Sequence, residues 1–304
     1  MPTFEFYTTD VFTSSKFGGN QLAVFPNAKG ISPTLYQAIA REFNFSETTF
    51  VLPPKDKKHT RLVKIFTPGG ELQFAGHPTV GTAVVLASIG AVKMKGKETK
   101  IVLEEGVGPV PVTVRATKGK PDYAQLTAAK VPEYGPPPPP AAELARLLGL
   151  DAGDIRTDDW YPEAASCGTQ FLFVPVKSRA AVARATCVMN EFDRVLGRYP
   201  TQKVFFFCNE PELEGSDFHA RMFAPGAGIA EDPATGSAAA AFAGCAGKRD
   251  KRTDGTLRWV IEQGFEMERP SILEVEADKK AGVITAARVG GNAVLVTRGE
   301  MELP

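Results

Sequence analysis

The sequence contains few of the residues that build metal sites and disulfide frameworks. Its 304 residues include only 3 histidines, 4 cysteines and 2 tryptophans. No two cysteines have C-x-x-C spacing and the histidines are scattered, so we predict no metal site. Four cysteines in so long a chain are expected to be reduced thiols rather than a disulfide scaffold.

The chain also lacks an excess of either charge. Lys plus Arg and Asp plus Glu are both 35, which gives a formal net charge of zero. Without a basic field, nucleic acid is not an expected partner, and a zero net charge favours a defined oligomer. Residues 80–92 form the longest apolar stretch, which is too short to cross a bilayer. Because Met1–Phe6 has no signal-peptide pattern, we expect a cytoplasmic protein without membrane contact.

The composition is that of a globular protein with one large domain or two ordinary ones. Hydrophobic residues make up 43% and charged residues 23%, so a sizeable core can be buried. The run Pro136–Pro140 cannot enter a helix or a central strand. We interpret it as an extended connection near the start of the second half.

Two similar blocks lie about half a chain apart. Ile65–Pro68 is followed by glycines, an acid and the stretch Gly76–Ala83, while Met222–Pro225 is followed by glycines, two acids and the stretch Ala234–Ala239. The prolines that end the two strand-like segments are 157 residues apart. Each block predicts a strand, a Pro/Gly turn, a glycine at a helix start and a helix of small residues. Two such blocks indicate an internal duplication.

The two helices predicted in these blocks, residues 79–92 and 237–247, lack a polar face and are therefore expected to be buried. Peripheral helices are predicted at 33–43, with Ser32 as N-cap, at 141–148 and at 189–196. β-Branched and aromatic residues between turn signals predict strands at 47–52, 62–66, 101–105, 110–115, 171–176, 204–208, 271–277 and 293–297.

The predicted fold class is therefore α+β. We expect two similar domains from an internal duplication, each a mostly antiparallel β-sheet wrapped around a buried central helix. The predicted N-terminal half covers residues 1–118, with a strand from the C-terminal end as a candidate to complete it. The C-terminal half covers residues 119–304.

Gly76 and Gly236 each stand at the beginning of a buried helix. The first N–H groups of a helix have no partner within it and the dipole is positive there, so each start can hold a carboxylate or phosphate. The structural alternative is that both glycines only permit tight turns. Neither segment matches G-x-x-x-x-G-K-[ST] or G-x-G-x-x-G, so a nucleotide is not expected.

Polar residues near these two starts have both structural and chemical readings. His77, at a helix start, is expected to be neutral and either caps the helix or relays a proton. Asp232 and Ser237 are candidate caps or substrate contacts. Glu47 opens a strand and composition alone places it in solvent. Of the other histidines, His59 is expected in a solvated loop and His219 on one face of a strand.

Several stretches together resemble the PhzF-like family, named for the phenazine-biosynthesis isomerase, which shares the diaminopimelate epimerase fold. They are Gly19–Phe25, Ser46–Val51, Ile65–Pro68 with Glu71-Leu72, Ala75–Thr82, Arg221–Pro225, Glu231–Ala238, and Gln263-Gly264 with Met267–Ser271. They span residues 19 to 271 in order. No role is assigned to the last stretch beyond lining the pocket.

The resemblance implies a cofactor-free isomerase with its active site in a cleft between two domains, usually as a homodimer. It assigns acid/base catalysis to Glu47, with His77, Asp232 and Ser237 assisting. It also implies that Asn20, Gly76 and Gly236 bind the substrate, a small carboxylate. In the related amino-acid epimerases cysteines stand at the two glycine positions, so a two-thiol racemase is not expected here.

Glu47 would move a proton between two carbons of a small cyclic or unsaturated carboxylate, which shifts a double bond. Epimerisation and elimination use the same base and stay open as alternatives. A third reading, from a different class, is a small-molecule binder with a degenerate site. The retained Glu47, His77, Asp232 and Ser237 argue against that reading, because a binder needs no acid/base glutamate.

Overall fold

The computed structural model describes residues 1–304 apart from the side chain of residue 227, and the described residues form 17 strands and six α-helices. They divide into two compact units, Met1–Ala129 with Val289–Pro304, and Lys130–Arg288. The division follows residue 129, not residue 118, because β8 (Lys120–Thr127) pairs with β7 (Gly108–Thr117) of the first unit. Most of β17 (Val283–Glu302) also belongs to the first unit.

The strands of the first unit hydrogen-bond in a closed order. Besides β7, β8 and β17, they are β1 (Thr3–Val11), β2 (Asn20–Phe25), β3 (Glu47–Leu52), β4 (Arg61–Phe66) and β6 (Glu98–Glu105). The pairings run β17–β1–β2–β3–β4–β6–β7–β8, and β8 pairs again with β17. Pairs β2–β3 and β4–β6 are parallel, and the other printed registers are antiparallel. This closure leaves the ring without an edge strand.

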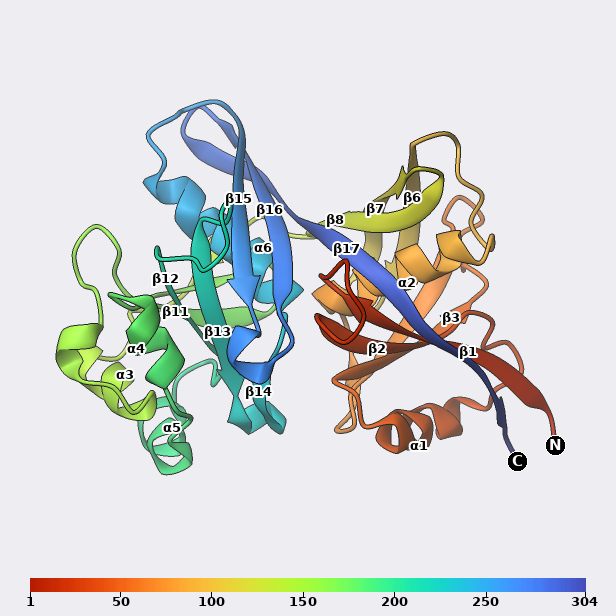
Figure 1. Cartoon of the computed structure of the whole chain (residues 1–304), viewed down its shortest axis with the longest axis horizontal. Helices are drawn as coiled ribbons and strands as arrows, with labels where there is room; N and C mark the ends of the chain where they lie inside the picture. Colours follow the sequence, from red (N-terminus) through yellow and green to blue (C-terminus); the bar gives the residue numbers. More distant parts are fainter. The chain divides into compact units, whose positions relative to one another are not determined.

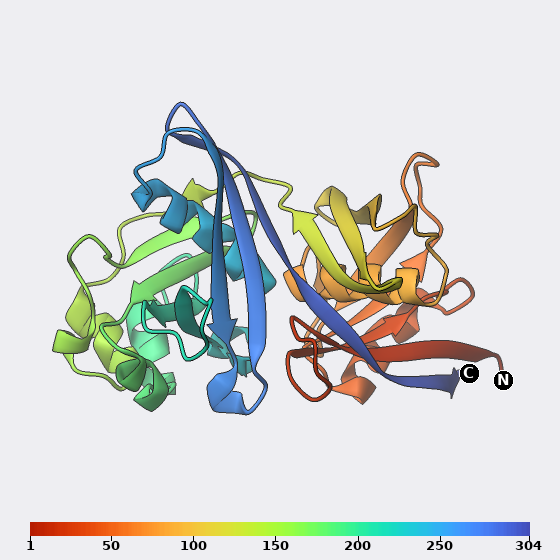
Figure 2. The same ribbon diagram turned by 45° about the horizontal axis from the view of Figure 1, so that its top comes forward.

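The two termini of the chain lie side by side because β1 and β17 pair along their whole shared length, from Thr3 opposite Glu302 to Val11 opposite Ala293 (Figures 1 and 2). Helix α1 (Pro33–Phe43) connects β2 to β3, and the short β5 (Glu71–Leu72) pairs with β4. Strand β5 leads directly into helix α2 (Gly76–Ser88).

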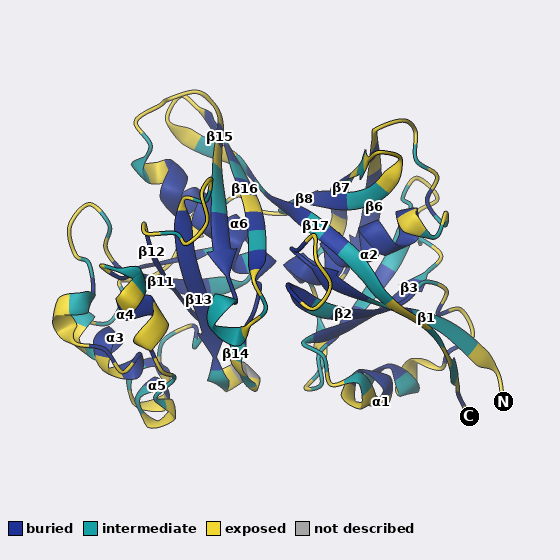
Figure 3. Cartoon of the chain, viewed as in Figure 1, coloured by how far each residue is buried: buried dark blue, intermediate teal, exposed yellow. Residues whose placement is uncertain are grey.

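Helix α2 is buried along nearly its whole length, from Gly76 to Ala87 (Figure 3). It packs against β8, β1, β2, β7 and β3. Its small residues let these strands approach its backbone: a Cβ atom added at Gly81 would lie 2.6 Å from Val11 Cγ2 and 2.7 Å from Leu22 Cδ2. The absence of a polar face in this segment therefore reflects contact on several sides at once.

The second unit repeats this order of pairings. Its strands are β9 (Glu133–Tyr134), β10 (Glu163–Ser166), β11 (Gln170–Pro175), β12 (Val204–Cys208), β13 (Phe218–Ala224), β14 (Ile229–Asp232), β15 (Gly255–Gln263) and β16 (Ser271–Lys280). They pair as β9–β10–β11–β12–β13–β15–β16, with β11–β12 and β13–β15 parallel, and β14 pairs with β13. Sheet β10–β16 thus has the same sequence of parallel and antiparallel neighbours as β1–β7.

Helix α6 (Gly236–Arg249) occupies the same place in chain order as α2 and packs against β16, β10, β11 and β15. Its Phe242 lies among four phenylalanines of neighbouring strands, Phe173, Phe205, Phe207 and Phe218. The helices α3 (Ala141–Leu147), α4 (Arg179–Arg184) and α5 (Met189–Leu196) instead expose one side to solvent (Figure 3).

Most element predictions are confirmed, with shifted ends. The bounds of α1, α5, β3 and β12 match, whereas α2 begins at Gly76 instead of 79 and ends at Ser88 instead of 92. Ser32 occupies the N-cap position, but its hydroxyl lies 2.8 Å from Thr34 Oγ1 and does not cap the helix. Strands β1, β2, β8, β10 and β15 and the short β5, β9 and β14 were not predicted. Over the described residues, no helix is long and apolar enough to cross a membrane.

We expect Gly81→Ala to lower the free energy of unfolding by about 1–3 kcal/mol, because the added methyl group overpacks the contact with Val11 and Leu22. Chemical denaturation monitored by circular dichroism measures this. The matched control is Gly153→Ala, at a position with no atom within 4 Å of an added Cβ, which should be neutral or slightly stabilising. A gain in stability for Gly81→Ala, as helix propensity alone predicts, would contradict the packing argument.

Candidate active site

The starts of α2 and α6 are buried and have no side-chain cap. The N-cap residues are Ala75 and Thr235, and neither side chain accepts a hydrogen bond from its helix. Neither first turn contains an acidic residue, and Gly76 and Gly236 are both buried. The positive ends of these helices are therefore not neutralised by a carboxylate of their own first turn. Each is suited to an anionic group of a ligand.

Glu47, His77 and Asn20 lie together at the start of α2. Glu47 is the first residue of β3 and Asn20 the first of β2, and these parallel strands are neighbours. Asn20 Nδ2 lies 3.2 Å from His77 Nδ1, and His77 Nε2 lies 3.1 Å from Glu47 Oε2. Asn20 is only 1% exposed, His77 4% and Glu47 8%. Glu47 is therefore enclosed in the structure, whereas composition alone suggested a solvated position.

The imidazole of His77 is neutral. Burial lowers its pKa to about 3, against a smaller raising effect of its contact with the Gln21 backbone. With the Asn20 amide donating to Nδ1, the hydrogen of the neutral ring is on Nε2, which faces Glu47. The 3.1 Å approach of Nε2 to Oε2 has ion-pair distance but not hydrogen-bond geometry. Because the ring is uncharged, the contact is not an ion pair between two charges.

This arrangement suits proton transfer at carbon. The Glu47 carboxylate is buried beside the imidazole, and a carboxylate is a side chain that can remove a proton from carbon. The neutral imidazole beside it offers a hydrogen-bond donor without adding a charge. The uncapped amides at the start of α2 supply positive potential to negative charge that develops on a bound molecule.

The start of α6 is organised by a second network. Thr235 Oγ1 donates to Asp232 Oδ2 at 2.6 Å, so the carboxylate binds the side chain of the N-cap residue. The Gln263 side chain accepts from Thr235 N and donates to the Asp232 carbonyl and to Thr235 Oγ1, at 3.0, 2.7 and 3.0 Å. Ser237 follows Gly236 and is partly exposed. Sequence reasoning gave Gln263 no role, although its Gln-Gly motif was the available signal.

Two other histidines lie outside these starts. His219 lies on β13, as predicted, and both ring nitrogens face carboxylates, Glu262 at 3.0 Å and Glu266 at 2.9 Å. These hydrogen bonds raise its pKa to about 9 against the opposing effect of burial. The prediction that His59 is solvated is wrong: its ring is largely covered and contacts Glu104 Oε1 at 2.9 Å. The Glu104 carboxylate also accepts hydrogen bonds from the backbone N–H groups of Lys55 and Asp56, and these bonds hold the loop that contains His59 in place.

The four cysteines are free thiols placed away from the two helix starts in sequence. Burial raises the pKa of Cys208 to about 11 and of Cys167 to about 12, and it also raises that of Cys245. A thiol with a raised pKa is a poor source of thiolate near neutral pH. Among the described side chains, no group of three or more His, Cys, Asp or Glu is arranged to hold a metal ion.

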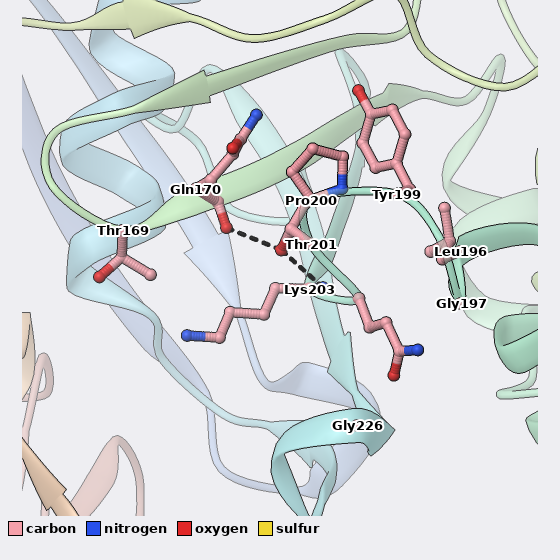
Figure 4. Close-up of a pocket in the computed structure, with 10 residues that line it drawn as sticks. Thr169, Gln170, Leu196, Gly197, Tyr199, Pro200, Thr201, Lys203 and Gly226 are labelled. Atoms are coloured by element: carbon pink, nitrogen blue, oxygen red, sulfur yellow. Dashed lines mark hydrogen bonds between the residues drawn. The ribbon is translucent and has the colours of Figure 1, made fainter.

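A pocket of about 350 Å³ lies in the second unit but contains none of the predicted site residues (Figure 4). Its wall includes Thr201, whose hydroxyl donates to the Gln170 carbonyl and accepts from Lys203 N. The remaining lining residues are Thr169, Leu196, Gly197, Tyr199, Pro200, Gln202 and Gly226. The pocket is open and contains no carboxylate or histidine, so it lacks a group that transfers protons near neutral pH.

Comparisons with known proteins agree on one family. The family model described as "Phenazine biosynthesis-like protein" matches residues 9–299. The chain is 39% identical to an uncharacterized isomerase of Mesorhizobium japonicum, over 99% of both chains. It is 32% identical to the trans-2,3-dihydro-3-hydroxyanthranilate isomerase of Pseudomonas chlororaphis, over 97% of this chain and 98% of that one. A PhzF-family protein of Bacillus anthracis has a similar crystal structure, with a TM-score of 0.88, 26% identity and full coverage of both chains.

We expect the His77 ring to stay neutral from pH 5 to 8, because its pKa is lowered to about 3. In the unfolded chain the ring titrates near 6.5, so its contribution to stability is present above pH 6.5 and is lost as the pH falls toward 3. NMR of ¹⁵N-histidine-labelled protein, with a His77→Asn variant for assignment, measures the ring directly. Protonation near pH 6.5 would contradict the burial argument.

We expect Gln263→Ala to lower the free energy of unfolding by about 2–4 kcal/mol, since it removes a buried side chain and three hydrogen bonds at the start of α6. Urea unfolding measures this, with Gln202→Ala in the wall of the open pocket as the comparison. Equal, small effects of the two substitutions would show that the network does not hold the helix start.

Proposed function

Because the chain belongs to the phenazine biosynthesis-like (PhzF) family, we propose that it is a cofactor-independent isomerase that moves a proton within a small cyclic or unsaturated carboxylate. Its relatives are named isomerases at 32–39% identity over nearly their whole length. The observation that carries the proposal is the buried carboxylate of Glu47, 3.1 Å from a neutral imidazole at an uncapped helix start.

In the proposed reaction Glu47 removes a proton from a carbon next to an unsaturated system. The electron pair of the broken C–H bond is delocalised toward the substrate carboxylate, and Glu47 returns the proton at another carbon. No electron or group leaves the substrate, so the double bond moves without net oxidation. One positioned acid/base group contributes about 10²–10⁴-fold in rate, which suits a substrate whose C–H bond is already activated.

The other predicted residues receive supporting roles in this proposal. Gly76 allows the substrate to approach the first amides of α2, and these amides stabilise the developing negative charge. Asn20 orients His77 through Nδ1, so that Nε2–H points to the Glu47 side. We assign assistance in proton transfer to Asp232 and Ser237, and substrate binding to Gly236. Whether the substrate lies between the two halves stays a prediction.

The shared pairing order supports an internal duplication. In each unit a parallel pair of strands, a following antiparallel strand and a short hairpin strand precede the glycine that starts a buried helix. We infer that the halves descend from one ancestral sheet, wrapped around a helix whose start binds an anion. The homodimer and the cytoplasmic location stay predictions.

We expect the wild-type protein in D₂O to place deuterium into its substrate and Glu47→Gln to lose turnover by about 10²–10⁴-fold, because the amide is not a base. A panel of cyclic and unsaturated carboxylates includes trans-2,3-dihydro-3-hydroxyanthranilate, the compound in the name of the Pseudomonas relative. Proton NMR follows the incorporation. Binding should persist in the variant, since the helix start is unchanged.

The matched control is Glu98→Gln, an exposed glutamate of β6 paired only with Arg115 on the surface, which should keep wild-type turnover. Turnover by Glu47→Gln at the wild-type rate would overturn the assignment of the base. Inversion of a stereocentre would favour epimerisation, and loss of a group from the substrate would favour a lyase. Binding of panel compounds without any exchange in the wild-type protein would favour a binder.

A further inference from the structure

A second buried carboxyl group, at the end of β6, contacts Thr79 in the first turn of α2. Glu105, the last residue of β6, is 6% exposed, and its Oε1 lies 2.6 Å from Thr79 Oγ1. Its Oε2 is buried without a hydrogen-bond partner. Sequence reasoning did not single out this residue, because a Glu-Glu pair at a strand end is typical of a surface.

The two short contacts of Thr79 favour a protonated Glu105 carboxyl. The Thr79 hydroxyl also donates to the Ala75 carbonyl, at 2.7 Å. A hydroxyl has one hydrogen and therefore cannot donate to both oxygens. Both contacts are hydrogen bonds at the same time when the Glu105 carboxyl carries a proton and donates to Thr79 Oγ1, whereas with an ionised carboxylate Thr79 donates to only one of the two oxygens. The result is a chain from the Glu105 carboxyl through the Thr79 hydroxyl to the Ala75 carbonyl.

This chain ends at the proposed catalytic turn. Ala75 is the N-cap residue of α2, directly before Gly76 and His77. The segment before Ala75 is tied to the same strand end, because Val107 N donates to the Gln73 carbonyl at 2.9 Å. The end of β6 thus supports the start of α2 at two points, of which only the Glu105 contact depends on a proton.

The environment of Glu105 supplies no countercharge. Burial raises its pKa to about 8, and the Thr79 hydrogen bond opposes this only in part. His77 on α2 is neutral, and the neighbouring Glu104 is held by its own backbone and histidine contacts. The cations of the strands beside β6 are committed to other groups, namely Arg61 to the carbonyls of residues 60 and 91, Lys64 to Glu71, and Arg115 to Glu98.

We propose that protonated Glu105 is a positioning residue that holds the first turn of α2, with Gly76 and His77, in its active arrangement through Thr79. Ionisation leaves an unpaired charge in the barrel and turns the Thr79 hydrogen from the Ala75 carbonyl to the carboxylate. The proton on Glu105 goes to solvent, and no covalent bond changes. The link to catalysis rests on the proposed function, whereas the link to His77 does not.

The pH dependence follows from the proton count. The unfolded chain loses this proton near pH 4.5 and the folded chain near pH 8, so between these values only the folded protein binds it. Stability therefore falls as the pH rises across this window. In Glu105→Gln the amide donates to Thr79 at every pH, and this fall should be absent.

We expect the ring ¹⁵N signals of His77 to change with a midpoint near pH 8 in the wild-type protein and to stay constant from pH 7 to 9.5 in Glu105→Gln. His77 itself does not titrate in this range, so the change reports the neighbouring carboxyl. Isomerisation of the panel compound that shows deuterium exchange should fall about tenfold per pH unit above the midpoint in the wild-type protein. In Glu105→Gln it should not fall in this way.

Further variants test whether Thr79 connects Glu105 to His77. Thr79→Val removes the hydroxyl and should uncouple His77 from Glu105, while Thr79→Ser should restore the coupling. Glu104→Gln, the matched neighbouring carboxyl whose pKa is lowered to about 2, should keep the wild-type profile above pH 7. His77 signals that do not change near pH 8, or that change equally in Glu105→Gln, would overturn the proposal. If the wild-type protein shows no deuterium exchange but its His77 signals change near pH 8 as expected, the proposed function alone is rejected.

Discussion

The start of α2 is buried, and this constraint determines much of the first unit. A helix start presents N–H groups without partners inside the helix, and here neither a capping side chain nor an acidic first turn neutralises them. Helix α2 must also carry small side chains, because five strands pack against it. Small residues meet the second requirement, and the proposed anionic substrate would meet the first. Binding capacity and packing are therefore two consequences of the same burial.

Burial also sets the protonation states around this helix. It lowers the pKa of His77 to about 3 and raises that of Glu105 to about 8, so both groups are neutral near pH 7. The adjacent Glu104 shows the opposite case: N–H groups of Lys55 and Asp56 lower its pKa to about 2. Two neighbouring glutamates on opposite faces of one strand thus have different charges, because one meets backbone donors and the other meets the barrel interior.

Sequence reasoning located the elements better than their environments. The helices at 33–43 and 189–196 were predicted with their observed bounds, and both glycine-led helices were expected to be buried. The division of the chain was placed too early, since nothing in residues 119–127 shows that they pair with β7. His59 was assigned to solvent because its partner, Glu104, lies 45 residues away.

Local pattern located the two helix starts, and short motifs carried the resemblance to the family, because those features lie within short stretches of sequence. Only that resemblance, not the local pattern, gave Glu47 as the expected base. Tertiary structure decided that Asn20, Glu47 and His77 meet, that the imidazole is neutral, and that Thr79 joins Glu105 to the helix start. These contacts join strands and helices that are distant in the chain. Their electrostatics depend on how completely the surrounding barrel excludes water, and no local pattern encodes that.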